Sequence, residues 1–440
     1  MTSPSSVLET KPVETKPASP SESQPTRRLM SLDALRGFDM FWIIGADSLV
    51  EALHKMSANS VTGALAYQLE HSDWEGMRFY DLIFPLFVFM AGVSLVFSLT
   101  KTIEREGRSK ALQRVFIRGV LLFLFGVFNN GGSSYAWPEF RVMGVLQRIA
   151  LAYFFAGLLF CFFKPRALVG ICAGILLGYW ALMAFVPIRD IQLEQTNLLH
   201  LAQQSGDTAA ANVFADSGSG RNQLRAASRP LFYATTNYVT GKYGKGFNVS
   251  NHFDYQYLPG RLYDSFWDPE GLLSTFPAIA TCLLGVFAGF LLRDTTVEDK
   301  RKAIYLLFLG AVAAGLGWFW GMQFPVIKKI WTSSYVLVAG GYSAMLLGTF
   351  YLVVDVWKMQ AWCRPFVWMG MNSITIYVTG NILGGNFNRL GQRLVGGSVR
   401  DFINHHIAQG FGEMLISITG LVLAFVFVRF LYQRKIFLRL

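Results

Sequence analysis

Residues 69–92 read LEHSDWEGMRFYDLIFPLFVFMAG, and this stretch joins titratable side chains to a long apolar run. His71 and Trp74 stand among acidic residues, whereas residues 82–99 contain no Asp, Glu, Lys or Arg. A run of roughly 18 apolar residues is what a helix needs to cross a bilayer, because its backbone groups must be bonded within the helix. The stretch therefore predicts a transmembrane helix with a histidine and carboxylates at its entrance.

The same apolar pattern recurs along the chain of 440 residues. Hydrophobic residues make up 52% of it and charged residues 15%, whereas a soluble domain carries about 25% charged residues. Further segments without charged residues are 119–138, 167–188, 271–292, 303–327, 330–354 and 365–388. We therefore predict an all-α polytopic membrane protein.

The hydropathy and charge pattern also predicts a topology. We expect about ten transmembrane helices, near residues 34–54, 78–100, 115–131, 142–163, 167–187, 271–292, 303–321, 331–353, 366–383 and 411–431. The loop 100–118 carries six basic residues and the next loop, 129–141, carries one. Because positive charge in short loops marks the cytoplasmic side, both termini are expected in the cytoplasm.

The expected membrane domain covers residues 29–440. One segment without a span precedes this domain, and another lies within it. Residues 1–28 are rich in Ser, Pro, Thr and Lys, which predicts a disordered cytoplasmic tail. Residues 188–270 form a long non-cytoplasmic loop, and its part 203–223 reads as flexible. A loop of this length favours a lid or a binding element.

Composition and residue spacing argue against a nucleic-acid partner and against a metal site. The formal net charge is +11, but the basic residues lie between spans rather than on one soluble face, so no nucleic-acid partner is expected. The four cysteines lack metal-ligand spacing and fall in or beside apolar runs, so we predict buried thiols and no metal site.

The first expected span carries an unusual number of charges. At about 100° per residue, Arg36, Asp47 and His54 fall almost on one line of a helix, flanked by Asp39 and Glu51. Charge in lipid is unfavourable, so this stripe should face the bundle interior or a water-filled cavity. An ion pair between Arg36 and Asp39 is the structural alternative.

Polar residues also enter the other spans near their non-cytoplasmic ends, and together they suggest one cavity that opens outward. They are Asp81, Arg148, Asp268, Glu270 and Asn372. A helix-capping role is the alternative for Asp268 and Glu270. His71 near Asp81 could act as a general base, while His54 is its rival and a solvated histidine is the ordinary reading.

Several segments resemble the heparan-α-glucosaminide N-acetyltransferase family and its bacterial relatives. They are RLMSLDALRG, the stretch 69–92, RVMGVLQRIALAY, WDPEGLLSTFPAIATCLLGVFAG, PVIKKIWTSSYVLVAGG and MGMNSITIY. The resemblance implies transfer of acetyl from cytosolic acetyl-CoA to a glucosamine amine across the membrane. It also implies that His71 is the active-site histidine and that Asp81 accompanies it. The family's asparagine after the first span has no match in GADSLVEALHKMSANS, where Asp47 is expected to stand nearby. Asp81 or Asp47 is expected to orient the catalytic His71.

Roles for the remaining candidates follow from this reading. Trp74, Asp268, Glu270, Arg148 and Asn372 are expected to bind the acceptor sugar. Arg36, Arg114, Arg118 and Lys164 are expected to bind the phosphates of acetyl-CoA, because guanidinium and ammonium groups pair well with phosphate. The family suggests a homodimer, and a bacterial cytoplasmic membrane fits the short tail. An amino-sugar transporter and an O-acetyltransferase of a cell-envelope sugar are the alternatives.

Overall fold

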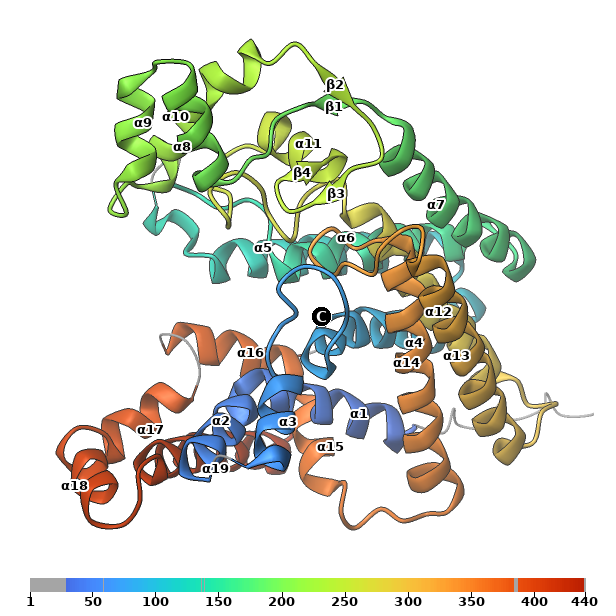
Figure 1. Ribbon diagram of the computed structural model, residues 1–440. Helices are drawn as coiled ribbons and strands as arrows, with labels where there is room; N and C mark the ends of the chain where they lie inside the picture. Colours follow the sequence, from blue (N-terminus) through green and yellow to red (C-terminus); the bar gives the residue numbers. More distant parts are fainter. Residues whose placement is uncertain (1–28, 58, 136, 138, 384–386, 439–440) are drawn as a thin grey trace, which may run out of the picture.

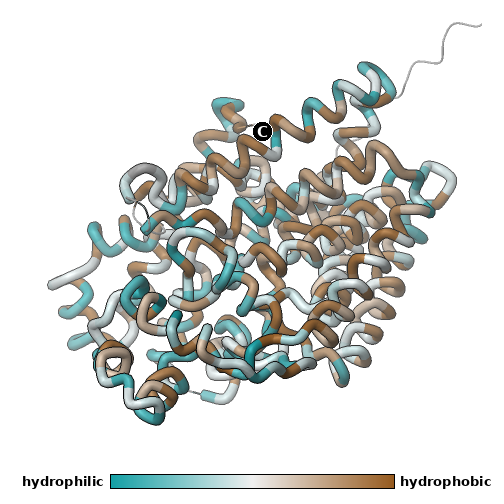
Figure 2. Tube along the Cα trace, turned by 90° about the horizontal axis from the view of Figure 1, so that it is seen from above, coloured by the Kyte–Doolittle hydropathy of each residue, from teal (hydrophilic) through white to brown (hydrophobic). Residues whose placement is uncertain are grey.

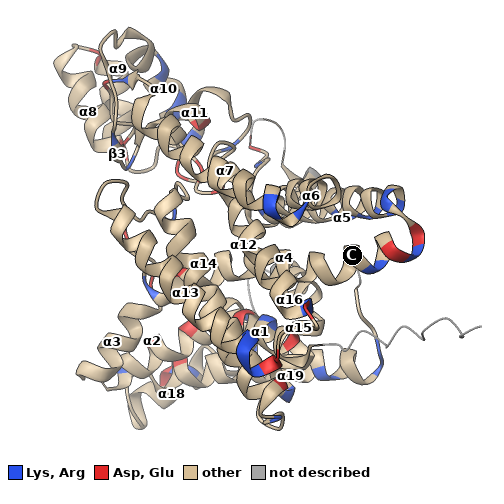
Figure 3. Cartoon of the chain, turned by 90° about the vertical axis from the view of Figure 1, so that its right-hand side faces the viewer, with Lys and Arg blue, Asp and Glu red and all other residues tan. Residues whose placement is uncertain are grey.

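The structure is a computed structural model that describes residues 29–440 except 58, 136, 138, 384–386 and 439–440. The predicted tail, residues 1–28, lies outside the described residues. Among these residues eight helices are long and apolar enough to cross a membrane. In Figure 1 α4 lies at the centre beside α12 and α14, α19 lies apart with α17 and α18, and a smaller helical group lies at the top. The long helices are mostly hydrophobic in Figure 2, and the charged residues of Figure 3 gather mainly at helix ends and in loops.

The eight long helices confirm the helical membrane fold. They are α4 (Phe79–Glu106), α5 (Arg108–Asn129), α6 (Val145–Phe162), α7 (Pro165–Phe185), α12 (Thr275–Arg293), α13 (Asp299–Gly321), α14 (Ser333–Phe350) and α19 (Phe411–Gln433). A π-helical turn, Tyr351–Val356, continues α14. The shorter helices near the bundle are α3 (Ser60–Gln68), α17 (Asn388–Val395) and α18 (Ser398–His406).

Two of the ten expected spans are interrupted, and this corrects the predicted count of continuous helices. The first consists of α1 (Met30–Phe41), a π-helical turn (Trp42–Ala46) and α2 (Asp47–Met56). The ninth consists of α15 (Arg364–Met371) and α16 (Ser373–Ile382). The average hydropathy of a segment does not reveal such breaks, because the residues on both sides of the break remain apolar.

The break in the first span splits the predicted charged stripe. Gly45 has φ +123°, a conformation that favours glycine, and the side chain of Asn388 fills the space where its Cβ would lie. His54, beyond the break, lies 3.2 Å from the Thr62 hydroxyl, and Glu51 pairs with Lys55 on the surface. The stripe therefore does not form one line that faces a single cavity.

Close backbone contact fixes α4 at the centre of the bundle. A Cβ on Gly92 would lie 1.9 Å from the carbonyl oxygen of Cys282, and one on Gly285 would lie 1.9 Å from that of Phe89. Small residues allow such contacts between membrane helices, where packing rather than water drives association. All four cysteines are buried, as predicted. The resulting α4–α12 pair gives the candidate site a rigid wall.

The segment 188–270 is a folded subdomain and not a flexible loop. It contains α8 (Gln195–Gln204), α9 (Thr208–Ala215), α10 (Arg221–Ala234) and α11 (Val249–Tyr257), which appear in green and yellow in Figure 1. Two short antiparallel pairs join β1 (Ile188–Arg189) to β2 (Tyr238–Val239) and β3 (Tyr243–Gly244) to β4 (Phe247–Asn248). The part predicted to be flexible is largely helical because Leu198, Phe214 and Leu224 build a local apolar core.

Candidate functional site

His71 lies in the connection between α3 and α4, and Asp81 lies in the first turn of α4. The carboxylate of Asp81 accepts backbone N–H groups from Ser72 and Arg78, each at 3.1 Å. It thus satisfies a free donor at the start of α4 and fixes the loop that carries His71. One buried side chain positions both the helix and the histidine.

A histidine, a carboxylate and a lysine meet at this point. His71 Nδ1 lies 2.9 Å from Asp81 Oδ1, and Lys328 Nζ lies 3.1 Å from the same oxygen. Lys328 Nζ is also 3.1 Å from His71 Nδ1. The Asp81 side chain is fully buried, whereas that of His71 is 53% exposed. The imidazole is therefore held on one side and open on the other.

The donors around Asp81 determine the tautomer of His71. Because two backbone N–H groups and Lys328 already donate to Asp81, it acts as a carboxylate acceptor and Nδ1 must be the donor. Lys328 Nζ and His71 Nδ1 are then close to each other because both donate to the same oxygen, Asp81 Oδ1. Burial lowers the pKa of Lys328, against the opposing effect of the Asp81 carboxylate. Nε2 of His71 is left with its lone pair, as general-base or nucleophilic chemistry requires.

Tyr80 joins this group to the first broken span. Its ring lies 4.8 Å from the His71 ring, centroid to centroid, and its hydroxyl lies 3.2 Å from Asp47 Oδ2. Asp47 thus reaches His71 only through Tyr80, and Asp81 is the carboxylate in direct contact with the imidazole.

A second charged group faces the first across the cavity. Arg141 donates two hydrogen bonds to Asp268, at 2.9 and 2.7 Å, and one to Glu270 at 2.7 Å. Asp268 also accepts backbone N–H groups from Tyr263 and Glu270 and is buried behind this pair. Burial and the Asp268 charge raise the pKa of Glu270. Glu270 thus lines the cavity beside Arg141, while Asp268 holds Arg141 from behind.

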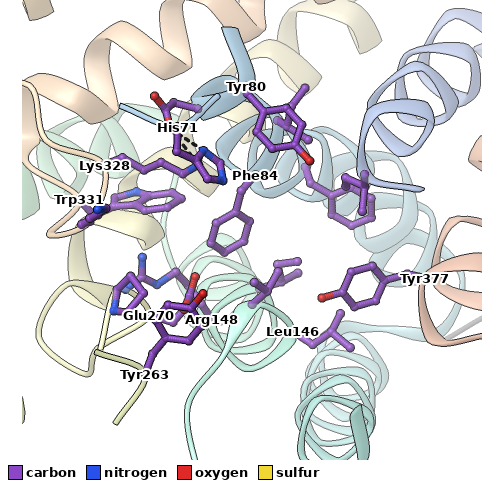
Figure 4. Close-up of a pocket in the computed structure, with 18 of the residues that line it drawn as sticks. His71, Tyr80, Phe84, Leu146, Arg148, Tyr263, Glu270, Lys328, Trp331 and Tyr377 are labelled. Atoms are coloured by element: carbon purple, nitrogen blue, oxygen red, sulfur yellow. Dashed lines mark hydrogen bonds and ion pairs between the residues drawn. The ribbon is translucent and has the colours of Figure 1, made fainter. Parts of the chain in front are cut away.

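These groups line a cavity of about 500 Å³, which we call the histidine cavity. Figure 4 shows His71 and Lys328 on one side and Arg148, Glu270 and Tyr263 across from them. Arg148 is fully buried, donates to Gly271 O at 3.4 Å and to Ser274, and lies 4.8 Å above the Trp331 ring. The remaining walls are mostly apolar, as is usual for a small-molecule site.

A second cavity of about 620 Å³, which we call the arginine cavity, adjoins the first. Its basic lining residues are Arg36, Lys101 and Arg118. The two cavities share five lining residues: Phe87, Leu146, Ile149, Ser373 and Ile374. These shared side chains form the partition between the cavities.

Helices α1, α4 and α6 run from one cavity to the other. In α4, Asp81 lines the histidine cavity and Lys101 the arginine cavity. At 1.5 Å per residue their separation is about 30 Å, close to the thickness of a bilayer's hydrocarbon core. The two cavities together thus extend along the membrane-spanning length of the bundle.

Two residues predicted to bind the acceptor have other contacts. The indole N–H of Trp74 donates to the carbonyl of Tyr243 at 2.7 Å, and its ring packs edge-on against Trp267. Trp74 thus joins the connection before α4 to the subdomain. Asn372 is buried, and its amide donates to Trp368 O at 3.2 Å. It lies beside Ser373 rather than among the residues that line the histidine cavity.

The predicted phosphate-binding residues divide into two groups. Arg36 and Arg118 line the arginine cavity, where Arg36 donates to Ser94 and pairs with Asp33 at 3.4 Å. The ion pair of Arg36 with Asp39, which was the structural alternative, does not form, because neither carboxylate oxygen of Asp39 has a hydrogen-bond partner among the described residues. Arg114 donates to Thr102 and lies near Glu106, and Lys164 precedes α7 as an exposed N-cap. Neither Arg114 nor Lys164 is among the described residues that line the cavity.

Lys328 and the role of Arg141 were not predicted from the sequence. Lys328 belongs to PVIKKIW, in the short connection between α13 and α14 that was expected on the non-cytoplasmic side. A lysine pair there departs from the positive-inside rule, and this was the available signal. For Arg141 the signal was similar, since it is the one basic residue in its loop. No group of three potential metal ligands is found in the described part of the chain.

Comparison with known proteins shows what this chain is similar to. Residues 28–208 match the family model described as heparan-alpha-glucosaminide N-acetyltransferase, catalytic. The chain is 29% identical to the mouse heparan-alpha-glucosaminide N-acetyltransferase over 389 residues, which are 82% of this chain and 55% of the relative. It is 28% identical to the human enzyme over 369 residues, 80% of this chain and 52% of the relative. The chain thus spans about half the length of the curated relatives it matches. The chain is thus similar to the heparan-alpha-glucosaminide N-acetyltransferase family, over residues 28–208 by the family model and over about four fifths of its length by the two relatives.

Proposed function

We propose that this protein is a membrane-embedded acetyltransferase that moves acetyl from acetyl-CoA to the amine of a glucosamine-type sugar. The observation that carries the proposal is the oriented His71 imidazole at one end of two adjoining cavities, with a basic cavity at the other end. The names of the relatives support the class of reaction, and both of them are N-acetyltransferases.

His71 supplies the proton acceptor in this mechanism. Nε2 takes a proton from the acceptor amine as the amine nitrogen bonds to the thioester carbonyl carbon. The carbon–sulfur bond then breaks, and the proton passes from Nε2 to the leaving sulfur. Asp81 holds the imidazole in the required tautomer and stabilises its protonated form, while Glu270 and Tyr263 are placed to orient the sugar.

A transient acetyl group on His71 is a second route that uses the same lone pair. In that route Nε2 bonds to the carbonyl carbon, the thiolate leaves, and the acceptor amine later displaces the imidazole. Mass spectrometry after incubation with acetyl-CoA alone distinguishes the routes, because only the second leaves an acetylated His71 peptide without acceptor.

The sidedness of the reaction is part of the proposal. The arginine cavity includes Lys101 and Arg118, which bound the basic loop 100–118. Positive charge of this kind favours the cytoplasm, so we place acetyl-CoA there and the acceptor at the histidine cavity. Arg118 supports phosphate binding because its buried Nε has no hydrogen-bond partner among the described residues.

The test uses purified protein in liposomes with acetyl-CoA labelled in the acetyl group. Acceptors are glucosamine, chitobiose and a matched sugar that carries only hydroxyl groups. The proposal expects labelled N-acetyl product from the amino sugars and none from the hydroxyl sugar. Product from the hydroxyl sugar alone would instead identify an O-acetyltransferase. Uptake of unmodified glucosamine without acetyl-CoA would identify a transporter.

A further inference from the structure

The chain that follows α19 folds back onto the arginine cavity. Lys435 N–H donates to Tyr432 O at 3.1 Å, and Ile436 N–H donates to Leu431 O at 2.9 Å. This pair of bonds is the Schellman arrangement that ends a helix and reverses the chain. The reversal brings Phe437 and Leu438 into the cavity wall.

The reversal uses an unfavourable residue at its critical position. Lys435 has φ +56°, one of four positive values among the described non-glycine residues. Glycine is the usual residue there, because a side chain in this conformation is strained. Such strain persists where surrounding contacts hold the backbone in place. Phe437 makes one such contact, since its ring lies 6.3 Å from the Tyr432 ring.

The wall built by this segment adds apolar surface next to the charged residues of the cavity. Arg36, Lys101 and Arg118 supply positive charge, which suits phosphate groups, and Asp33, which pairs with Arg36, offsets part of it. Phe437 adds an aromatic ring, and Leu438, 42% exposed, adds an aliphatic side chain. A cavity with basic groups and an aromatic ring fits a nucleotide, whose phosphates and base need these two surfaces respectively.

We infer that Arg434–Leu438 form a clasp for the nucleotide end of the donor, in which Phe437 packs against the purine base. This inference rests on the proposed function, because it takes acetyl-CoA as the donor. The clasp contributes affinity and not chemistry, since the partition and the histidine cavity separate it from His71.

The first experiment compares two donors in Phe437→Ala. Acetyl-CoA carries the nucleotide, whereas S-acetylpantetheine carries the same thioester without it. We expect the KM for acetyl-CoA to rise on the order of tenfold, with kcat changed less than twofold, because the lost contact is the same in ground and transition states. The KM for S-acetylpantetheine should not change. The matched control is Phe319→Ala, which removes an exposed phenylalanine from α13.

The second experiment tests the turn through Lys435. Lys435→Gly retains the left-handed conformation and should keep the wild-type KM. Lys435→Pro removes the N–H that donates to Tyr432 and cannot adopt a positive φ. It should therefore raise the KM for acetyl-CoA as Phe437→Ala does.

Calorimetric binding of CoA to the wild type and to Phe437→Ala gives a readout that does not require transfer. A roughly tenfold weaker Kd in the variant supports the clasp even if the acceptor assignment fails. An unchanged Kd, a tighter Kd, or an equal rise in KM for both donors would overturn it. Failure of the proposed function has a different signature, namely no labelled product from the wild type.

Discussion

Asp81→Asn gives a detailed test of how the site orients His71. One carboxylate oxygen of Asp81 accepts the backbone N–H groups of Ser72 and Arg78, and the other accepts His71 and Lys328. Asparagine has one acceptor oxygen and one donor group. If its oxygen serves the two backbone donors, its NH₂ faces Nδ1 and Nζ. The reverse orientation would leave two buried backbone donors without acceptors, at about 1–3 kcal/mol each.

The favoured orientation therefore forces a change of tautomer in His71. Nδ1 must become an acceptor, so Nε2 carries the proton and loses the lone pair that the reaction needs. We expect kcat to fall about 10³-fold, which corresponds to about 4 kcal/mol in the activation free energy. The KM for the acceptor should change little, because the Asp81 carboxylate contacts the histidine and not the sugar.

The assay is initial-rate transfer of labelled acetyl to glucosamine, with thermal unfolding to show that the variant is folded. Asp73→Asn is the matched control, since Asp73 is an exposed aspartate two residues from His71. A folded Asp81→Asn variant with kcat within threefold of the wild type would refute this account of the tautomer.

Three further predictions concern the surroundings of the site. Arg141→Met leaves the buried Asp268 carboxylate without its guanidinium, so we expect a loss of about 3–5 kcal/mol in the free energy of unfolding, measured by denaturant titration. Burial lowers the pKa of His252 to about 4 from its ordinary value of 6.5. The stability that neutral His252 contributes is therefore fully present above its ordinary pKa of 6.5 and is lost as the pH falls through about 4. Hydrogen exchange in α11 should accelerate between these two pH values in the wild type but not in His252→Gln. Trp74→Phe removes the hydrogen bond to Tyr243 and should lower the melting temperature, with a cost of about 1 kcal/mol, while the acceptor KM stays unchanged in the transfer assay.

The sequence predicts the helical membrane fold because hydropathy is a property of each segment by itself. The break at Gly45 is not visible in this way, since it depends on Asn388 from a distant helix that occupies the space of a side chain. The subdomain was misjudged for a related reason. Residues 203–223 have a loop-like composition, but Phe214 and Leu224 find a core supplied by other parts of the segment.

The candidate site shows the same limit. The block that contains His71 and Asp81 is local in sequence, so its geometry could be anticipated from the resemblance. Lys328 joins that pair from 247 residues away, and only the packing of the α13–α14 connection against α4 brings it there. Lys164 was expected to bind phosphate because it is basic. Whether a residue lines a cavity depends on how the helices pack and not on its charge.

The transfer rate of His71→Ala tests most directly whether His71 is the catalytic base. His200→Ala is the matched control, because His200 is an exposed histidine of the subdomain. Both variants are assayed for labelled acetyl transfer from acetyl-CoA to glucosamine after folding is checked by thermal unfolding. We expect kcat to fall at least 10²-fold in His71→Ala and to stay at the wild-type value in His200→Ala. A folded His71→Ala protein that acetylates glucosamine at the wild-type rate would contradict the account.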